Sequence, residues 1–329
     1  MARPVAVVTG GAGFIGSHMV DLLVERDFEV RIVDNFRGGH ERNLAHHTTN
    51  PNVTVDRTDI TKLEPTASVF RDAQHVFHFA GIADIVPSID NPTDYLNTNV
   101  MGTVRVLEAA REAKVGKLVY AASSSCYGMA QTPTTEGHPI SPQYPYALSK
   151  FQGEQAAFHW HKVYRLPVNS VRIFNAYGPR VRTTGVYGAV FGVFLKQKLA
   201  GKPYTVVGDG HQSRDFIYVT DVAKAFWAAG TTSLAGRVWN IGAGNPQSIL
   251  RLVELLEGPI CHLPKRPGEP DITWADISAI QADLGWQPEV AFDQGVRQML
   301  AQIDAWADAP LWDPASIEAA TKTWFERLA

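Results

Sequence analysis

The feature that most constrains the fold is a glycine-rich turn between two apolar segments near the start of the chain. A valine-rich run at 5–9 is typical of a strand buried on both faces of a parallel sheet. The glycines that follow, at 10, 11, 13 and 16, allow a tight turn and a close approach of the backbone to a pyrophosphate. Free N–H groups at the start of the next helix bind such an anion. The turn therefore predicts a dinucleotide site, with a purely structural turn as the alternative.

Acidic residues follow the next two predicted strands and support this site. Asp34 ends the strand EVRIVD, 18 positions after Gly16, where a carboxylate accepts hydrogen bonds from the adenosine ribose. Asp59 follows the third predicted strand and is either an acceptor for the adenine amino group or a cap of the next helix.

Strand and helix patterns alternate through the first half of the chain, which predicts an α/β fold. Helical patterns such as 95–114 and 144–164 separate the apolar strands, and this alternation indicates a Rossmann-type doubly wound parallel sheet. The predicted strands after the first are 29–34, 52–56, 75–81, 117–123 and 168–174. We expect a dinucleotide-binding domain at 1–176, with strands added from the second half, and a smaller mixed α/β substrate-binding lobe at 177–329.

Composition excludes several classes of function. The net charge of −3 offers no basic field for nucleic acid or an anionic membrane. Cys126 and Cys261 lie far apart and lack metal-ligand spacing, so we expect reduced thiols, no metal site and a cytoplasmic protein. No stretch is long and apolar enough to span a membrane. His78 lies between apolar residues of a predicted strand, and we interpret it as a core residue.

The motif PYALSK is the strongest candidate for catalysis. Tyr146 and Lys150 stand four residues apart, so their side chains share one face of the predicted helix. A lysine ammonium beside a phenol lowers the phenol pKa from its usual value of about 10, which makes tyrosine a general base for a sugar hydroxyl. Ser123, Ser124 and Ser125 end the preceding predicted strand and can supply a hydroxyl that orients the substrate oxygen.

These motifs occur together with several others spread over nearly the whole chain. The set comprises TGGAGFIGSH (9–18), VDNF (33–36), HFAG (78–81), AASSSCYG (121–128), YPYALSK (144–150), RIFNAYGPR (172–180), GDGHQSRDFIYVTDVA (208–223) and RPGE (266–269). The set resembles the extended short-chain dehydrogenase/reductase family, and within it the NAD-dependent nucleotide-sugar epimerases and dehydratases. The pattern is most similar to that of UDP-hexose 4-epimerases.

The resemblance implies a tightly bound NAD and assigns the catalytic residues. Tyr146 resembles the family's base, Lys150 its partner, Ser123 the catalytic hydroxyl and Ser124 an auxiliary one. The implied cofactor contacts, besides Tyr146 and Lys150, are Gly10, Gly13, Phe14, Ile15, Gly16, Asp34, Asn35, Asp59, Ile60, Phe79, Ala80, Gly81 and Asn99.

The charge of Asp34 bears on the choice between the two nicotinamide cofactors. A 2′-phosphate would meet the carboxylate of Asp34, which favours NAD over NADP. Arg37 follows closely enough to keep NADP open as an alternative.

The resemblance also implies a nucleotide-diphosphate sugar, in particular a UDP-sugar, as substrate. Asn175, Arg214 and Arg266 resemble the residues that hold the diphosphate, and an arginine fork offers paired donors to phosphate oxygens. Further implied substrate contacts are Ser123, Ser124, Tyr146, Ala189, Val190, Val206 and Thr273. Gly192 replaces a proline of many relatives and leaves the choice of base open.

The serine run indicates which reaction to expect. Ser124 and Ser125 occupy positions where the family's dehydratases carry an Asp-Glu pair, and the glutamate of its decarboxylases is also missing, so elimination lacks its acid and base. We therefore expect epimerisation, at C4, of a hexose, N-acetylhexosamine or hexuronate through a 4-keto intermediate. Thr273 replaces a bulky tyrosine of glucose-restricted epimerases and leaves room for a larger sugar.

Other outcomes remain open from the sequence. They are a 2-epimerase, a dehydrogenase, a dehydratase, a decarboxylase, and an inactive NAD-binding regulator, which the presence of Tyr146 and Lys150 disfavours. The resemblance further implies a homodimer with a four-helix interface between helices 95–113 and 146–164. Val100, Val104, Leu107, Phe151 and Phe158 are its candidate contacts, with burial inside the monomer as the alternative.

Overall fold

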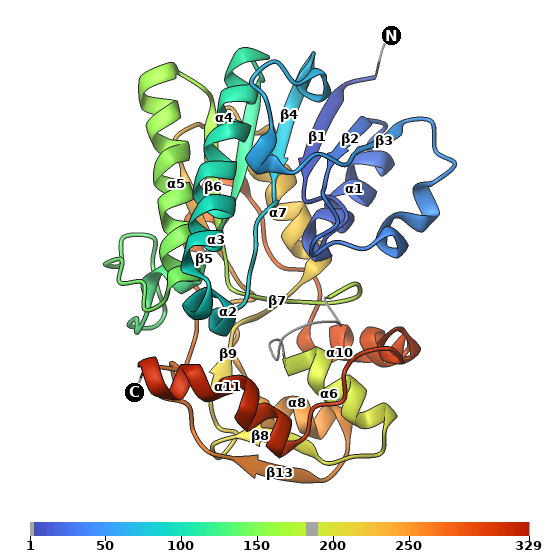
Figure 1. The fold of residues 1–329 in the computed structure, drawn as a ribbon, viewed down its shortest axis with the longest axis vertical. Helices are drawn as coiled ribbons and strands as arrows, with labels where there is room; N and C mark the ends of the chain where they lie inside the picture. The colour runs from blue at the N-terminus through green and yellow to red at the C-terminus, as the bar shows by residue number, and fades with distance from the viewer. Residues whose placement is uncertain (1–2, 182–189, 329) are drawn as a thin grey trace.

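The computed structural model describes residues 3–181 and 190–328, which form two lobes (Figure 1). The larger lobe contains a seven-stranded parallel sheet with the order β11-β6-β5-β4-β1-β2-β3. Its strands are β1 (Val5–Thr9), β2 (Glu29–Val33), β3 (Val53–Asp56), β4 (Ala73–His78), β5 (Lys117–Ser123), β6 (Val168–Ile173) and β11 (Val238–Ile241). The expected α/β class with a doubly wound parallel sheet is confirmed.

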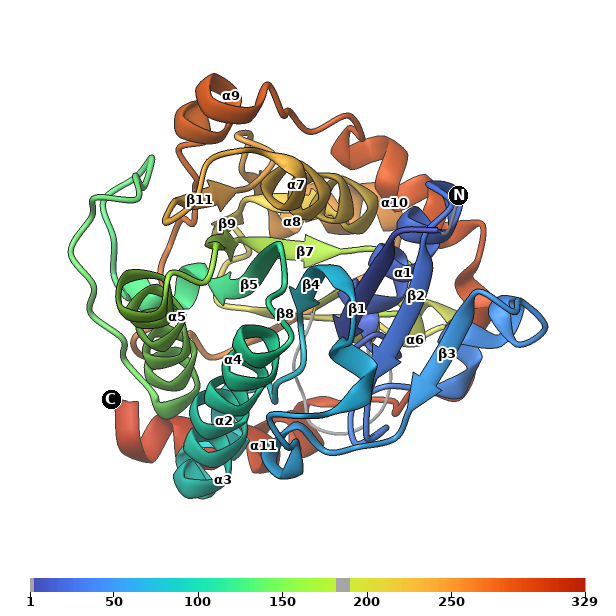
Figure 2. The same ribbon diagram turned by 90° about the horizontal axis from the view of Figure 1, so that it is seen from above.

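Helices cover both faces of this sheet (Figure 2). Side chains alternate along β1, so Val5 and Val7 enter one core, against α4 (Gly102–Glu112) and α5 (Pro145–Tyr164). Ala6 and Val8 enter the other core, against α1 (Phe14–Glu25) and α7 (Val219–Thr231). Burial on both faces explains why the strand is apolar throughout rather than alternating.

The strand order reverses between β1 and β4, and this reversal determines where a ligand-binding crevice can form. The chain leaves β1 toward β2 and β3, and it returns through β4 toward β5 and β6 on the other side. The loops after β1 and β4 therefore diverge and open a crevice at the carboxyl ends of the strands, where ligands bind in this class of fold.

The smaller lobe packs around a separate core. Its parallel pair is β8 (Tyr204–Val207) with β13 (Ile260–Leu263), and its helices are α6 (Val190–Leu199), α8 (Ile249–Leu256), α10 (Phe292–Leu300) and α11 (Pro314–Leu328). Two short pairs complete the strands: β7 (Asn175–Tyr177) with β10 (Phe216–Tyr218), and β9 (Ser213–Arg214) with β12 (Gln247–Ser248). The remaining helices are α2 (Ile85–Asp90), α3 (Pro92–Leu96) and α9 (Ser278–Leu284).

The structure differs from the sequence prediction in several elements. The helix expected at 95–114 is divided into α3, a π-helical turn at Asn97–Met101 and α4. The strands β11 and β13 and the helix α11 were not predicted. Within the described residues, no helix has the length and apolar character needed to cross a membrane.

His78 is a core residue, as its apolar neighbours predicted. Its Nδ1 lies 2.6 Å from the hydroxyl of Thr9, and its Nε2 lies 2.9 Å from the hydroxyl of Thr103. Burial lowers the pKa of His78 to about 3, so the ring is neutral. The two hydroxyls satisfy both ring nitrogens and tie β4 to β1 and α4.

A buried ion pair joins β6 to α5. The Arg172 guanidinium donates to the Glu154 carboxylate at 2.6 and 3.0 Å, and Glu154 also accepts a hydrogen bond from Ser170 at 2.8 Å. Arg172 also donates to the hydroxyl of Tyr127 at 2.7 Å. Because both charges are out of water, removing one of them leaves the other uncompensated.

We expect Arg172→Met to lower the free energy of unfolding by about 3–5 kcal/mol, because Glu154 would remain buried without its partner. The double variant Arg172→Met/Glu154→Leu should recover most of that loss. Urea unfolding followed by circular dichroism measures both. Arg111→Met is the matched control, because Arg111 pairs with Glu108 at the surface. Equal losses in the Arg172 and Arg111 variants would contradict the account.

Candidate active site

The glycine turn packs too closely for any side chain at two of its positions. Gly10 has φ +72°, and a Cβ there would lie 2.7 Å from the backbone nitrogen of Ala80. A Cβ on Gly16 would lie 2.1 Å from the carbonyl oxygen of Gly10. Gly13 caps α1 without a side-chain hydrogen bond, and the first N–H groups of a helix without such a cap suit an anion.

Asp34 holds the turn and retains capacity for a ligand. Its Oδ2 accepts from the backbone nitrogen of Ala12 at 2.9 Å, and its Oδ1 accepts from that of Phe36 at 2.8 Å. Burial raises the pKa of Asp34, and these two bonds oppose that rise. A carboxylate has about four acceptor positions, so two remain for ribose hydroxyls. The turn and Asp34 together fit a dinucleotide.

The loop after Asp34 is held by two side-chain pairs. Arg37 binds the carboxylate of Asp94 through both terminal nitrogens, so its charge is engaged by that carboxylate. Asn35 donates to Asp59 at 2.8 Å, and Asp59 accepts from the backbone nitrogen of Thr61 at 2.8 Å. The capping interpretation of Asp59 is therefore confirmed, and its contact with adenine stays a prediction.

Asn99 positions the loop that follows β4. Its side chain accepts from the backbone nitrogen of Ile82 at 2.8 Å and donates to the carbonyl oxygen of Ile82 at 2.9 Å. It also donates to the Ser149 hydroxyl at 2.9 Å, and Ser149 in turn donates to the carbonyl oxygen of Tyr146. Asn99 thus connects the loop after β4 to the first turn of α5.

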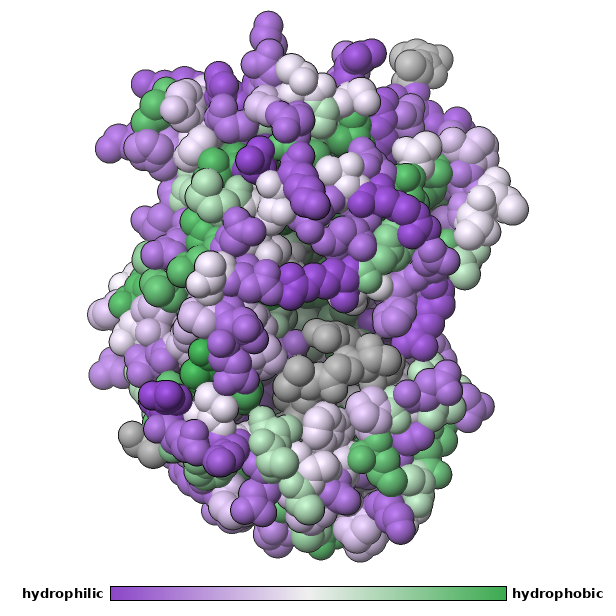
Figure 3. Space-filling view, in the orientation of Figure 1, coloured by the Kyte–Doolittle hydropathy of each residue, from purple (hydrophilic) through white to green (hydrophobic). Residues whose placement is uncertain are grey.

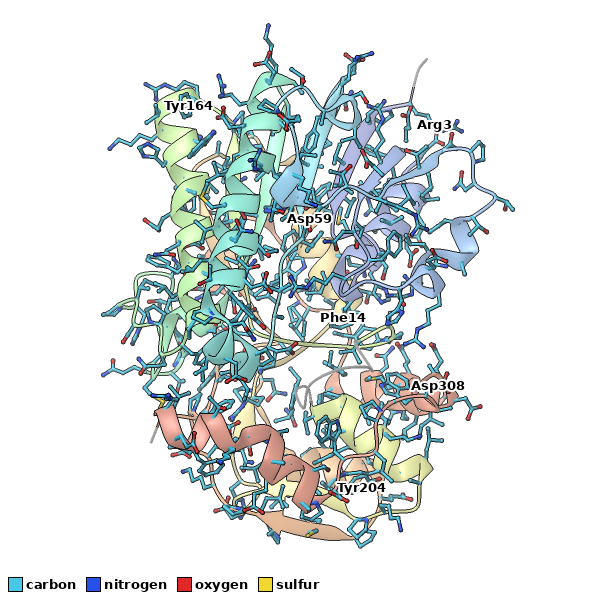
Figure 4. The ribbon with its side chains drawn as sticks, viewed as in Figure 1. Arg3, Phe14, Asp59, Tyr164, Tyr204 and Asp308 are labelled. Carbon is cyan, nitrogen blue, oxygen red and sulfur yellow. The ribbon has the colours of Figure 1, made fainter. Side chains whose placement is uncertain are left out.

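The other predicted cofactor contacts surround the same crevice. Ile60 is buried in the core beside α4, and Phe14, Ile15, Phe79 and Ala80 are partly buried, while Gly81 is exposed. Phe14 begins α1 but packs against the core of the smaller lobe, at the level where the lobes meet (Figure 4).

Ser123 and Tyr146 meet at the end of β5. Ser123 accepts a hydrogen bond from the backbone nitrogen of Ser125 at 3.2 Å, and the two hydroxyls lie 2.8 Å apart. Burial raises the pKa of Tyr146, and its hydrogen bond with Ser123 opposes that rise. The Tyr146 ring contacts that of Tyr144, stacked at a centroid distance of 6.4 Å.

The net direction of the Tyr146 pKa differs from the one that its spacing to Lys150 predicted. Lys150 is buried, and desolvation lowers its pKa to about 8. Its Nζ lies 4.6 Å from the ring centroid of Tyr120. Spacing alone predicted a lowered pKa for Tyr146, but both groups are desolvated, and desolvation favours the neutral form of each.

A cleft of about 470 Å³ extends from the serine run into the smaller lobe. The surface is hollowed between the two lobes (Figure 3). The cleft is lined by seven of the predicted residues, namely Ser123, Ser124, Asn175, Val190, Arg214, Arg266 and Thr273. Side chains that the sequence analysis did not assign also line it: Asp84, Gln143, Tyr144, Phe191, Gln212, Glu269, Thr321 and Trp324. Their signal in the sequence was weak because they come from six separate places in the chain.

Of the other predicted substrate contacts within the described residues, Tyr146 and Val206 are not in this wall, and Tyr146 lies behind it, hydrogen-bonded to Ser123. The side chain of Val206 is fully buried in the core of the smaller lobe, while Thr205 and Val207 line the cleft. Side chains alternate along a strand, so β8 presents the neighbours of Val206 to the cleft, and the prediction for Val206 is wrong. Ala189 lies outside the described residues.

The two predicted diphosphate arginines share one carboxylate. Arg214 lies 2.8 Å from Glu269, and Arg266 lies 3.9 Å from the other oxygen of Glu269. Nearby, Thr273 donates to the side-chain oxygen of Asn175 at 2.7 Å. The arrangement presents two arginines on the wall of one cleft, which suits an anionic group.

A second polar cluster lies on α1. The Oδ1 of Asp21 is 2.7 Å from Nε2 of His46 and 2.8 Å from Nε2 of His47, and its Oδ2 is 2.8 Å from Arg180. These histidines end a 3-10 turn at Glu41–His47. The three side chains could each offer one atom to a metal ion, which the sequence analysis did not predict.

Comparisons with known proteins show strong similarity over most of the chain. Residues 6–242 match the model of the NAD dependent epimerase/dehydratase family. A putative UDP-glucose 4-epimerase of Methanocaldococcus jannaschii is 34% identical over 303 residues, which are 89% of this chain and 96% of that protein.

Comparison with solved structures indicates the same family. UDP-N-acetylglucosamine 4-epimerase of Methanobrevibacter ruminantium, in complex with UDP-N-acetylmuramic acid, has a TM-score of 0.85 and 31% identity over 92% of this chain and 100% of its own. UDP-glucuronic acid 4-epimerase of Bacillus cereus, in complex with UDP-glucuronic acid and NAD, has a TM-score of 0.85 and 32% identity over 92% and 99%.

We expect this protein to bind NAD at least tenfold more tightly than NADP, because a 2′-phosphate would meet Asp34 while Arg37 is engaged by Asp94. Asp94→Asn should release Arg37 and tighten NADP binding by about threefold to tenfold, with NAD affinity unchanged. Titration calorimetry on the cofactor-stripped protein measures both constants. Asp90→Asn, an exposed carboxylate on α2, is the control. The same NAD-to-NADP ratio in both variants would show that the Arg37–Asp94 pair has no such role.

Proposed function

Because this chain belongs to the NAD dependent epimerase/dehydratase family, we propose that it epimerises a nucleotide-diphosphate sugar, most simply a UDP-sugar, at C4. The resemblance inferred from the motifs is thereby confirmed at the level of the family. The observation that carries the proposal is the cleft, which joins the Ser123–Tyr146 end of β5 to an arginine pair. NAD, when bound, supplies the chemistry of removing a hydride from a sugar carbon and returning it.

Tyr146 of α5 and Ser123 at the end of β5 carry out the proton transfer. Tyr146, as the phenolate, takes the proton of the C4 hydroxyl, and Ser123 orients that oxygen through its own hydroxyl. Lys150 adds a positive charge while it is protonated, which favours the phenolate. After the sugar has turned, Tyr146 returns the proton to the oxygen at C4, which completes the hydroxyl of the new epimer.

The arginine pair keeps the substrate in the cleft during that rotation. Arg214 and Arg266 bind the diphosphate, and their shared partner Glu269 holds both guanidinium groups near one position. The sugar beyond the diphosphate is then the part that is free to turn. Anchoring at the diphosphate thus allows one base to serve both epimers.

One observation keeps a dehydratase as the second candidate. Ser124 and Ser125 line the cleft where the family's dehydratases carry carboxylates, which favours epimerisation. Asp84, from the loop before α2, also lines the cleft and is close enough for its charge to raise the pKa of Tyr146. A carboxylate at this place is a candidate acid or base for loss of water.

Incubation with UDP-, dTDP- and GDP-linked hexoses, N-acetylhexosamines and uronates tests the proposal. Epimerisation gives a product of unchanged mass with a new C4 configuration in the NMR spectrum. Dehydration gives a product lighter by one water, and a net dehydrogenase accumulates free NADH. Absence of any epimer from all of these sugars, in protein that contains NAD, would overturn the proposal.

We expect Tyr146→Phe to lower kcat by at least about 100-fold, because it removes the general base and leaves the fold and the NAD content unchanged. Tyr144→Phe is the matched control, since Tyr144 stacks on Tyr146 and lines the cleft but has no part in proton transfer. Steady-state kinetics and the absorbance of released cofactor measure the two effects. Comparable losses of kcat in the two variants would contradict the assignment.

Activity should depend on pH through the titration of Tyr146 and Lys150. A raised pKa means that the fraction of Tyr146 phenolate, and with it kcat/KM, increases with pH. Lys150 loses its proton near its pKa of about 8, so the increase should level off or reverse above that pH. A kcat/KM profile that falls steadily from pH 6 to pH 9 would be inconsistent with both shifts.

The size of the sugar site is testable at Thr273. Thr273→Tyr should abolish turnover of UDP-N-acetylhexosamines while retaining at least a tenth of the turnover of UDP-hexoses, because the larger ring fills the cleft beside Asn175. Thr273→Val removes the hydrogen bond to Asn175 without adding bulk and is the control. A uniform loss on all sugars in the tyrosine variant would refute a steric gate.

We also propose a homodimer that pairs α4 and α5 with their symmetry mates. Of the candidate contacts, Val100, Val104, Phe151 and Phe158 are partly exposed, whereas Leu107 is fully buried in the monomer core and is excluded. Met101, on the turn before α4, is 52% exposed and adds apolar area to this surface. Light scattering during size-exclusion chromatography measures the mass of the assembly.

The cytoplasmic location expected from the sequence stays a prediction.

A further inference from the structure

Helix α11 presents one stripe of side chains to the rest of the protein. Ile317, Thr321 and Trp324 are buried, and their spacing of four and three residues puts them on one helical face. The Thr321 hydroxyl donates to the carbonyl oxygen of Ile317 at 2.8 Å, so its polar atom is satisfied within the helix. Phe325, the next residue after Trp324, is 36% exposed and lies on the outer side.

The segment that leads into α11 is anchored to the smaller lobe. Gln197 of α6 donates to the carbonyl oxygen of Trp312 at 2.9 Å. The carboxylate of Asp313 accepts from the backbone nitrogen of Ser316 at 2.8 Å and caps the first turn. The helix is therefore fixed at its start as well as along its buried face.

This placement makes α11 part of the cleft wall. The helix lies across the front of the smaller lobe, below α2, and packs against α2 (Figure 1). Thr321 and Trp324 line the same cleft as Arg266 and as Asp84, at the start of α2. The C-terminal helix thus spans the cleft wall from the larger lobe to the arginine pair.

Trp324 contacts the loop that carries Arg266. The indole N–H donates to the carbonyl oxygen of Pro267 at 2.8 Å. The guanidinium carbon of Arg266 lies 5.5 Å from the centroid of the Trp324 ring, within the range at which an aromatic face attracts a cation. Glu269 lies 3.9 Å from the same guanidinium. Arg266 is held by an aromatic face and a carboxylate at once.

We propose that Trp324 is a positioning residue for Arg266 and that α11 forms a wall of the diphosphate subsite. The proposal rests on the proposed function, because it takes Arg266 to bind a substrate diphosphate. Without the indole, the guanidinium is free to adopt more directions, and a nucleoside diphosphate should bind about tenfold more weakly. Proton transfer at Tyr146 does not involve this helix, so kcat should change less than KM.

The first measurement is calorimetric titration of the NAD-loaded wild-type protein with UDP, dTDP and GDP. Failure of all three to bind would show that the proposed function is wrong, before any variant is made. The diphosphate that binds most tightly then serves as the probe, and its nucleoside, which lacks the phosphates, serves as the control ligand.

Trp324→Ala should raise the Kd of the diphosphate about tenfold and that of the nucleoside less than twofold. Trp324→Phe retains a ring and should fall between wild type and Trp324→Ala, whereas Trp324→Leu, which fills the space without a π face, should resemble Trp324→Ala. Phe325→Ala, on the exposed side of α11, should match wild type. Melting temperatures identify any variant that does not fold. If Trp324→Ala does not fold, the diphosphate affinity of Trp324→Phe relative to wild type tests the proposal.

A double-mutant cycle decides whether Trp324 acts through Arg266. In an Arg266→Ala background, Trp324→Ala should weaken the diphosphate by less than twofold, because the group it positions is gone. Kinetics with the accepted sugar should show a raised KM and a kcat within about threefold of wild type. An undiminished effect in the Arg266→Ala background, or equal losses for diphosphate and nucleoside, would overturn the proposal.

Discussion

The contact between the glycine turn and the loop after β4 is the constraint on which the rest of the site depends. Gly10 brings its backbone so near to Ala80 that a Cβ would lie 2.7 Å from the amide nitrogen. This approach sets the width of the crevice at the point where the strand order reverses. Asp34 fixes the same turn from the other side through the amide of Ala12. The residues that would hold a dinucleotide thus lie at the carboxyl ends of β1, β2 and β4.

Burial controls the chemistry beside that crevice more than proximity does. Tyr146 and Lys150 are one helical turn apart, yet desolvation shifts the pKa of each toward its neutral form. The same environment keeps His78 neutral between two hydroxyls. A proton-transfer group in a dry site loses stabilisation by water and depends on the few charges that reach it. For Tyr146, those neighbours are Ser123 as hydrogen-bond partner and Asp84 as an opposing charge.

The smaller lobe supplies the anion-binding end of the cleft through a chain of contacts. Glu269 draws Arg214 and Arg266 together, and Trp324 supports Arg266 from α11. Arg214, the neighbouring pair Arg266 and Glu269, and Trp324 come from three distant parts of the chain, so the clamp forms only when the smaller lobe has folded. The family relation, shown by the match over residues 6–242, is thus combined with a C-terminal wall that the matched segment does not include.

The sequence by itself predicted six of the seven strands of the sheet, the glycine turn and the positions of Asp34, Ser123, Tyr146 and Lys150, because each depends on local spacing and on strand or helix periodicity. Only the tertiary structure decided which side of β8 faces the cleft, where Thr205 and Val207 replace Val206. It also decided that Asp59 caps a turn, and that Asp94 engages Arg37. Helix α11 reached the cleft by packing between elements far away in the chain, and no local pattern records such a contact. The directions in which the pKa values of Tyr146 and Lys150 shift also depend on burial, which cannot be predicted from spacing along a helix.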